Sequence, residues 1–162
     1  METAFLLLGS NMGDRYKFLQ EALKLLNAKC GTIISQSKIY KSEPWGFEAE
    51  QGFLNMALEI ETKLDPHILL SFILQIERRL GRTRVNDGKY HSRSIDIDII
   101  FYGNRIVETK DLVIPHLSMH LRRFVLVPLN EIVPDYIHPT LKATVNELLT
   151  LCVDKSEVIE YC

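Results

Sequence analysis

The pattern of apolar and polar positions predicts strands and helices in alternation along the chain. The continuous apolar run at 4–8 is typical of a central strand that is covered on both faces. Apolar residues at helical spacing predict a helix over 15–27, with Asp14 as its N-cap. The same reasoning predicts strands at 32–40, 53–61 and 93–102, and a helix from Pro66 to Leu80 that Asp65 caps.

This order of elements predicts the fold class. Strand, helix, strand, strand, helix, strand is the split βαβ pattern of ferredoxin-like α+β folds. We therefore expect a four-stranded, mainly antiparallel sheet with helices on one face, plus C-terminal additions. Pro128, Pro134 and Pro139 are expected to break the tail into turns before a short helix at 145–152. The length fits a single domain, residues 1–162.

The strand at 93–100 carries two carboxylates on one face. Side chains alternate along a strand, so its isoleucines at odd positions face one way, whereas Asp96 and Asp98 face the other. Neighbouring carboxylates repel each other, and Mg²⁺ prefers hard oxygen ligands of this kind. The motif alone leaves two interpretations open, which are a magnesium site and a solvated face with two charges.

The segment before this strand is strongly basic. It carries six basic residues against Glu77 and Asp87, although the whole chain has a net charge of −2. Arginines that bind phosphate beside a bridging cation are what phosphoryl-type transfer needs, and a basic loop on a solvated surface is the alternative. The basic residues are Arg78, Arg79, Arg82, Arg84, Lys89 and Arg93.

Two further sets of residues are candidates for ligand contacts. Phe53 and Asn55 share one face of their strand, which suits a flat heterocycle as well as it suits core packing. His116 and His120 have the i, i+4 spacing of metal ligands, but no Glu lies between them and no cysteine is near. Phosphate contact by His116 and Arg122 fits the rest of the sequence better than zinc.

Composition narrows the classes of protein. No apolar run approaches the ~20 residues of a membrane span, and the first residues lack the basic region of a signal peptide. Three cysteines without CxxC spacing favour the reducing cytoplasm. An isoelectric point near 6.2 gives no general attraction to nucleic acid.

Several blocks, in collinear order over roughly 4–139, resemble the 6-hydroxymethyl-7,8-dihydropterin pyrophosphokinase family of folate biosynthesis. The RxxDxD segment is the most specific of them. The blocks are Gly9-Ser10-Asn11, Tyr40-Lys41-Ser42-Glu43-Pro44, Phe53-Leu54-Asn55, Glu77 with Gly81-Arg82, Arg93-Ser94-Ile95-Asp96-Ile97-Asp98, and Pro115-His116 with Arg122 and Phe124.

The resemblance implies a reaction and a set of roles. In that family ATP is the co-substrate, its β,γ-pyrophosphate passes to the hydroxymethyl oxygen of the pterin, and AMP leaves. Asp96 and Asp98 would hold two Mg²⁺ ions, and Arg82 and Arg93 would stabilise charge on the transferring group. The implied nucleotide contacts are Glu77, Arg84, Lys89, Tyr90, Arg93, Ile99, His116 and Arg122. The implied pterin contacts are Ser42, Glu43, Pro44, Trp45, Phe53, Asn55, Asp96 and Phe124.

The sequence also departs from the family pattern. His91 stands where a small residue is usual, Phe53 and Leu117 replace frequent tyrosines, and Tyr90 replaces a frequent tryptophan. These departures bear on affinity rather than on the class of reaction.

Two other functions stay open at this point. One is an RNA-binding module on a ferredoxin-like sheet, although the RNP1 pattern is missing and the paired aspartates would repel a phosphate backbone. The other is a metal-binding or regulatory domain without turnover. We expect a monomeric enzyme whose partners are ATP and the pterin, with neither nucleic acid nor membrane.

Overall fold

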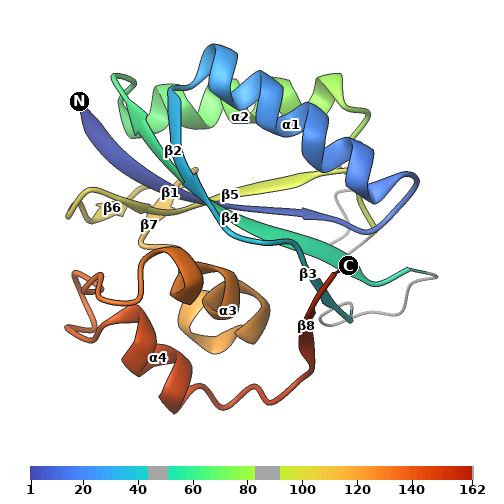
Figure 1. Cartoon of the computed structure of the whole chain (residues 1–162). Coiled ribbons are helices and arrows are strands. Elements are labelled where there is room, and N and C mark those ends of the chain that lie inside the picture. Colours follow the sequence, from blue (N-terminus) through green and yellow to red (C-terminus); the bar gives the residue numbers. More distant parts are fainter. Residues whose placement is uncertain (44–50, 83–91, 162) are drawn as a thin grey trace.

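A central antiparallel sheet organises the chain in the computed structural model, which describes residues 1–43, 51–82 and 92–161 (Figure 1). Six strands form this sheet in the order β5-β1-β4-β3-β8, with β2 also pairing with β4. The strands are β1 (Glu2–Ser10), β2 (Thr32–Gln36), β3 (Tyr40–Ser42), β4 (Phe53–Thr62), β5 (Asp96–Tyr102) and β8 (Val158–Glu160); β6 (Val107–Glu108) and β7 (Val113–Ile114) form a separate two-stranded ribbon.

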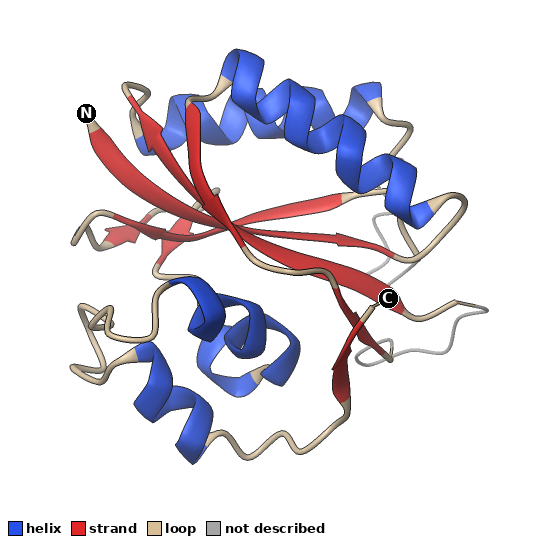
Figure 2. Cartoon of the chain, viewed as in Figure 1, coloured by secondary structure: helices blue, strands red, loops and turns tan. Residues whose placement is uncertain are grey.

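Helices cover both faces of the sheet (Figure 2). On one face lie α1 (Arg15–Lys29) and α2 (Pro66–Arg79), and on the other lie α3 (Arg123–Ile132) and α4 (Val145–Leu151). A 3₁₀ turn, η1 (Met119–Leu121), leads into α3. Among the described residues, no helix combines the length and apolarity that crossing a bilayer requires.

The expected antiparallel sheet is present, but two parts of the fold prediction were wrong. The sheet has six strands rather than four. The predicted strand at 32–40 ends at Gln36 as β2, a separate strand β3 begins at Tyr40, and β8 adds a strand at the edge. Helices lie on both faces rather than on one, because α3 and α4 partly cover the second face.

Helix α3 was missed because Pro128 lies inside it. Proline has no N–H, so the helical bond back to the Phe124 carbonyl cannot form. The helix forms nevertheless, since Val125, Leu126 and Leu129 bury their side chains against the sheet. Tertiary burial supplies most helical stability in proteins, and here it outweighs the loss of one hydrogen bond.

Strand alternation divides the interior into two cores. Met56, Leu58 and Ile60 face the core under α1 and α2, and the even-numbered apolar residues of β1 join them. Phe5 and Leu7 face the opposite core under α3 and α4. A strand buried on both faces has apolar residues at consecutive positions, which explains the continuous run in β1.

The predicted helix starts are confirmed. Asp14 is the N-cap of α1, and its carboxylate accepts a hydrogen bond of 3.1 Å from the Lys17 backbone N–H. Asp65 is the N-cap residue of α2 and precedes Pro66, but its side chain makes no capping hydrogen bond; Gly81, at φ +90°, follows the end of that helix.

The junction between α1 and β2 requires a glycine for steric reasons. An ideal Cβ on Gly31 would lie 2.2 Å from the carbonyl oxygen of Glu61 on the neighbouring strand. The same junction is held by the Thr62 hydroxyl, which donates to the Cys30 carbonyl at 2.6 Å. The first helix can therefore return to the sheet at this place only if residue 31 has no side chain.

We predict that Gly31→Ala lowers the free energy of unfolding by about 2 kcal/mol, because the added methyl forces two backbone segments apart. For a domain of this size the melting temperature would fall by about 5 °C. Thermal unfolding followed by circular dichroism measures this. Lys29→Ala, at an exposed position two residues earlier, is the control, and an equal loss in both variants would contradict the steric explanation.

Candidate active site

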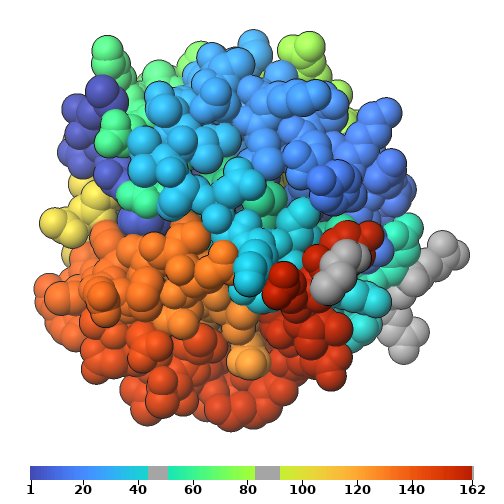
Figure 3. Space-filling view, in the orientation of Figure 1, coloured from blue at the N-terminus to red at the C-terminus, as the bar shows by residue number. Residues whose placement is uncertain are grey.

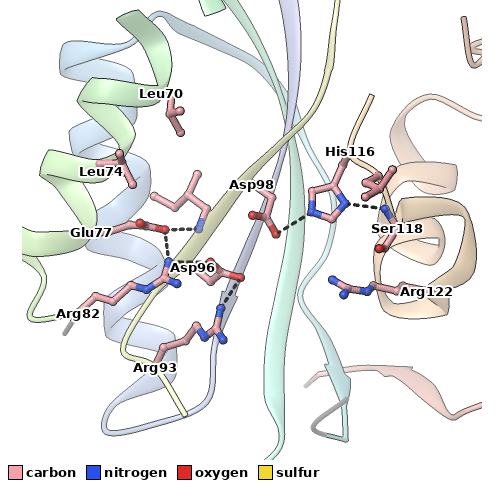
Figure 4. A pocket seen from close by; sticks show the side chains of 12 residues that line it. Leu70, Leu74, Glu77, Arg82, Arg93, Asp96, Asp98, His116, Ser118 and Arg122 are labelled. Atoms are coloured by element: carbon pink, nitrogen blue, oxygen red, sulfur yellow. Dashed lines mark hydrogen bonds and ion pairs between the residues drawn. The ribbon is translucent and has the colours of Figure 1, made fainter. Parts of the chain in front are cut away.

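A pocket of about 400 Å³ opens between α2, β5 and the turn that precedes α3 (Figure 4). It lies beside β5, the strand at one edge of the sheet, where side chains from three parts of the chain meet. Seven of the residues that the sequence singled out line it together: Glu77, Arg82, Arg93, Asp96, Asp98, His116 and Arg122.

Arg82 forms the centre of an ionic network in this pocket. One of its guanidinium nitrogens, Nη1, lies 2.6 Å from Glu77 Oε2 and 2.8 Å from Asp96 Oδ1. Arg93 reaches the other oxygen of Asp96 at 3.3 Å. The predicted proximity of the paired aspartates to the basic segment is therefore confirmed for these two arginines.

Glu77 is buried beneath this network, with 2% of its surface exposed. Its Oε2 also accepts a hydrogen bond of 2.9 Å from the Ile97 backbone N–H. A buried carboxylate is stable only when it is paired, and here one oxygen receives both a guanidinium and a backbone donor. Glu77 thus ties α2 to the start of β5 and fixes the place of Arg82.

The surroundings of Asp98 disfavour its charged form. Burial, together with the carboxylates of Asp96 and Glu77, raises the pKa of Asp98 to about 8, although Arg122 and Arg82 act in the opposite direction. Its side chain is only half-buried, with 34% of its surface exposed on the pocket side. A carboxylate with such a pKa favours an added positive charge beside it.

His116 stands on the other side of Asp98. Its Nε2 is 4.0 Å from Asp98 Oδ2, and its Nδ1 accepts a hydrogen bond of 3.3 Å from the Ser118 backbone N–H. Burial and the nearby Arg122 lower the pKa of His116, so the ring is neutral at pH 7. Because Nδ1 is the acceptor, the proton is on Nε2, which is a donor directed into the pocket.

Strand register brings the predicted pterin residues beside this charged wall. Asp96 pairs with Gly9 on β1, and Gly9 pairs with Asn55 on β4. A Cβ on Gly9 would lie 3.0 Å from Asn55 Oδ1 and 3.4 Å from a ring carbon of Phe53. Paired residues of antiparallel strands share a face, so Asp96 and Asn55 lie on one face with no side chain between them.

The amide of Asn55 is held in one orientation. Asn55 is 1% exposed, and its Nδ2 donates a hydrogen bond of 2.7 Å to the Ser42 hydroxyl on β3. Its Oδ1 faces the space above Gly9. Phe124, half-buried at the start of α3, has the Arg122 guanidinium 5.9 Å from its ring centroid.

Other predicted residues are not part of this arrangement. The side chain of Ile99 packs in the core under α1 and α2, and Glu43 is exposed just after β3. Among the described residues, no group of three or more His, Cys, Asp or Glu is placed to hold a metal ion. Pro44, Trp45, Arg84, Lys89, Tyr90 and His91 lie outside the described residues.

Asn11 is a residue whose role sequence reasoning missed. It is 2% exposed, and its Oδ1 accepts a hydrogen bond of 2.7 Å from the Arg93 backbone N–H. Its own N–H donates to the Arg93 carbonyl at 3.2 Å, and its Nδ2 donates to the Ser92 hydroxyl at 3.2 Å. The only signal in the sequence was its membership of the Gly9-Ser10-Asn11 block, since the two partners are more than 80 residues apart.

The pocket combines paired carboxylates, arginines and a neutral imidazole. These groups are typical of one class of protein, the enzymes of phosphoryl-type transfer. The family model of 7,8-dihydro-6-hydroxymethylpterin-pyrophosphokinase matches residues 5–134, and the chain belongs to this family.

Curated relatives agree with this assignment. The chain is 41% identical over 141 residues to the 2-amino-4-hydroxy-6-hydroxymethyldihydropteridine pyrophosphokinase of Porphyromonas gingivalis, covering 86% of this chain and 95% of that one. The Bacillus subtilis protein of the same name is 44% identical over 130 residues, covering 80% and 77%. The Folic acid synthesis protein FOL1 of Dictyostelium discoideum is 44% identical over 144 residues, but this chain spans only 22% of its length.

Solved structures share the fold at lower identity. A structure described as HPPK-DHPS in complex with substrates matches with a TM-score of 0.75 and 18% identity, covering 92% of this chain and 43% of that chain. Wild-type HPPK-DHPS of Plasmodium falciparum matches with a TM-score of 0.72 and 18% identity, covering 92% and 44%. The chain therefore spans less than half of the solved chains that it matches.

We predict that Asn11→Ala lowers kcat by about tenfold, because the backbone of Arg93 loses a buried acceptor and the guanidinium shifts from its place. Steady-state kinetics and thermal unfolding should be measured together. A lower melting temperature with unchanged kcat would limit Asn11 to a structural role.

Ser10→Ala is the matched control for this variant. Ser10 is adjacent and fully buried, and its hydroxyl has no hydrogen-bond partner in the part of the chain that the structure describes. Removing an unpaired buried hydroxyl costs nothing in hydrogen bonding, so activity within twofold of wild type is expected.

Proposed function

We propose that the pocket transfers the β,γ-pyrophosphoryl group of ATP to the hydroxymethyl oxygen of 6-hydroxymethyl-7,8-dihydropterin. The hydroxyl oxygen would attack the β-phosphorus, the bond from that phosphorus to the α,β-bridging oxygen would break, and AMP would leave. The hydroxyl proton would pass to solvent. The observation that carries the proposal is the strand pairing, in which Asp96 on β5 and Asn55 on β4 lie on either side of Gly9 on β1.

Family membership supports this reaction directly. The family model covers most of the chain, and the pyrophosphokinases of Porphyromonas gingivalis and Bacillus subtilis match over most of their own lengths. Phosphoryl-type transfer requires positioning and charge stabilisation more than covalent chemistry, which suits the side chains of this pocket.

We assign Asp96 and Asp98 as the ligands of magnesium, with two ions as the family resemblance implies. Their oxygens are the hard donors that Mg²⁺ prefers, and the pKa of Asp98, raised by burial and then by the carboxylates of Asp96 and Glu77, is one that a nearby cation would lower. Two carboxylates do not fill six coordination positions, so phosphate oxygens and water would supply the others. The bound ions would neutralise charge on the triphosphate.

The cationic side chains would hold the phosphates. Arg82 and Arg93 now pair with Asp96 at the rim of the pocket, where they would stabilise charge on the transferring group. His116 Nε2 and Arg122 on the opposite wall would donate to the nucleotide. Glu77, which holds Arg82 and the Ile97 N–H, would act chiefly by fixing that guanidinium.

The pterin would lie over Gly9, where the missing Cβ leaves space. Asn55 would read the edge of the heterocycle with an amide that is already oriented by Ser42. Phe53 on β4 and Phe124 on α3 would stack on its faces. Glu43, Pro44, Trp45, Arg84, Lys89, Tyr90 and the backbone near Ile99 stay predictions from the resemblance.

Four further expectations about the whole chain belong with this proposal. We propose that residues 1–162 form one pyrophosphokinase domain, and that strands β5, β1, β4 and β2 with α1 and α2 correspond to a ferredoxin-like unit. A monomeric state and a cytoplasmic location stay predictions from the sequence.

We predict that Asp98→Asn lowers AMP formation from ATP and the hydroxymethyl pterin by at least about a hundredfold, since removing a charge stabiliser typically costs that much. The assay is chromatographic detection of AMP, with and without the pterin and with Mg²⁺ or chelator present. Asp65→Asn removes a carboxylate that is exposed at the start of α2 and is the matched control. Near-wild-type turnover by Asp98→Asn would contradict the metal assignment.

We also predict that Asn55→Ala raises KM for the pterin by about tenfold and leaves KM for ATP within twofold, because a buried amide that recognises a substrate edge contributes to only one binding site. Asn104→Ala, in the exposed turn after β5, is the control. Equal changes in both KM values would mean that Asn55 supports the fold rather than the pterin.

A further inference from the structure

The segment at 152–161 lies outside the part of the chain that the family model matches, yet it contacts the start of α3 and strand β3, which carry residues proposed to bind the pterin. It leaves α4 at Cys152, which is 3% exposed in the core under α3 and α4. From there it runs across the molecule to β8, beside β3 (Figure 1). Two attachments along this path have consequences for the site.

The first attachment is at Asp154. Its Oδ2 accepts a hydrogen bond of 3.0 Å from the backbone N–H of Arg123, the first residue of α3. Its Oδ1 accepts from the N–H and the hydroxyl of Ser156, at 2.9 Å and 2.6 Å. The carboxylate is therefore held by its own segment on one side while it binds the helix on the other.

Asp154 takes the place of a missing local cap. The N-cap residue of α3 is Arg122, which makes no side-chain capping bond. A carboxylate beside free N–H groups at a helix start is favourable, because it accepts a hydrogen bond and interacts with the positive end of the helix dipole. Burial opposes ionisation of Asp154, but its hydrogen bonds to Ser156 and Arg123 keep its pKa below the usual range, so it is charged at neutral pH.

The bond lies between two site residues. Arg123 is flanked by Arg122, which lines the charged pocket, and by Phe124, the predicted stacking partner of the pterin. The Arg122 guanidinium lies over the Phe124 ring at 5.9 Å. A hydrogen bond to the peptide between them fixes the direction from which both side chains leave the backbone.

The second attachment is β8, which is paired with β3. Val158 is opposite Ser42, and the Tyr161 N–H donates to the Ile39 carbonyl at 2.8 Å. Ser42 is the residue that orients Asn55. Figure 3 shows the red C-terminal segment against the cyan residues of this strand. The same ten residues thus hold the Ser42 wall and the Phe124 wall in relation to each other.

We propose that Asp154 is a positioning residue for the pyrophosphokinase reaction, which sets the Arg122–Phe124 wall of the pterin and nucleotide sites by capping α3 from a distant segment. The inference rests on the function proposed above. Asp154 contacts no substrate in this role, and it acts on binding rather than on the charged groups at Asp96.

The positioning role of Asp154 can be tested by steady-state kinetics of the Asp154→Ala variant of the full chain. We expect KM for the pterin and for ATP to rise by about tenfold, which is the effect of losing one hydrogen bond to a charged group. The value of kcat should stay within threefold, because Arg82, Asp96 and Asp98 are untouched. Asp154→Asn keeps an oxygen that can accept from Arg123 and should restore part of the affinity.

Glu157→Gln is the matched control, since it removes an exposed carboxylate from the same segment. It should leave both KM values within twofold of wild type. Melting temperatures of all variants separate positioning from stability, because a merely structural cap would lower the melting temperature and leave KM of the folded enzyme unchanged.

The outcomes are distinguishable. If the wild-type chain forms AMP and the KM values of Asp154→Ala are unchanged, this inference is overturned and the proposed function stays intact. Equal shifts in Asp154→Ala and Glu157→Gln would overturn it also. Wild-type chain that forms no AMP with either substrate in excess would overturn the proposed function, and the inference with it.

Discussion

The register between β5, β1 and β4 is the constraint on which the site depends. It places Asp96, Gly9 and Asn55 side by side across three strands, although they come from distant parts of the sequence. A slip of one residue in either pairing would turn one of these side chains to the opposite face, toward α1 and α2. The apolar residues that alternate with them in both cores make such a slip costly, so the packing of the sheet also specifies the geometry of the pocket.

The carboxylates of the pocket differ in how they are paired with arginines. The pocket gathers three carboxylates, and the structure balances them unequally. Glu77 and Asp96 receive hydrogen bonds from Arg82, whereas Asp98 is left with a strongly raised pKa. The same wall can therefore present arginines to phosphate and a carboxylate pair to a cation, which are the two requirements for handling a triphosphate.

The second face of the sheet connects the core to the site. Helix α3 packs over β4, and its N-cap residue Arg122 lines the pocket two residues before Phe124, so the burial that holds the helix also places these two side chains. The C-terminal segment then joins the start of α3 to β3 through Asp154 and β8. Residues beyond the boundary of the family model thereby become part of the frame around the site.

Local patterns were sufficient to predict several features. The spacing of leucines in α1, the Asp65-Pro66 start of α2 and the alternation in β4 depend on neighbours in the sequence, and each is confirmed. The association of Asp96 with a basic segment could also be predicted from the sequence, because Arg93 is only three residues away. Local patterns failed at α3, where Pro128 argued against a helix that long-range burial stabilises.

Only the tertiary structure decided the contacts between distant segments. Asn11 with Arg93, Gly9 with Asn55, and Asp154 with the start of α3 join residues that no periodicity connects. The sequence by itself determined which elements form and which chemical groups are available to them. The folded sheet decided which of those groups meet, because strand register and the packing of helices on two faces are set by the whole chain at once.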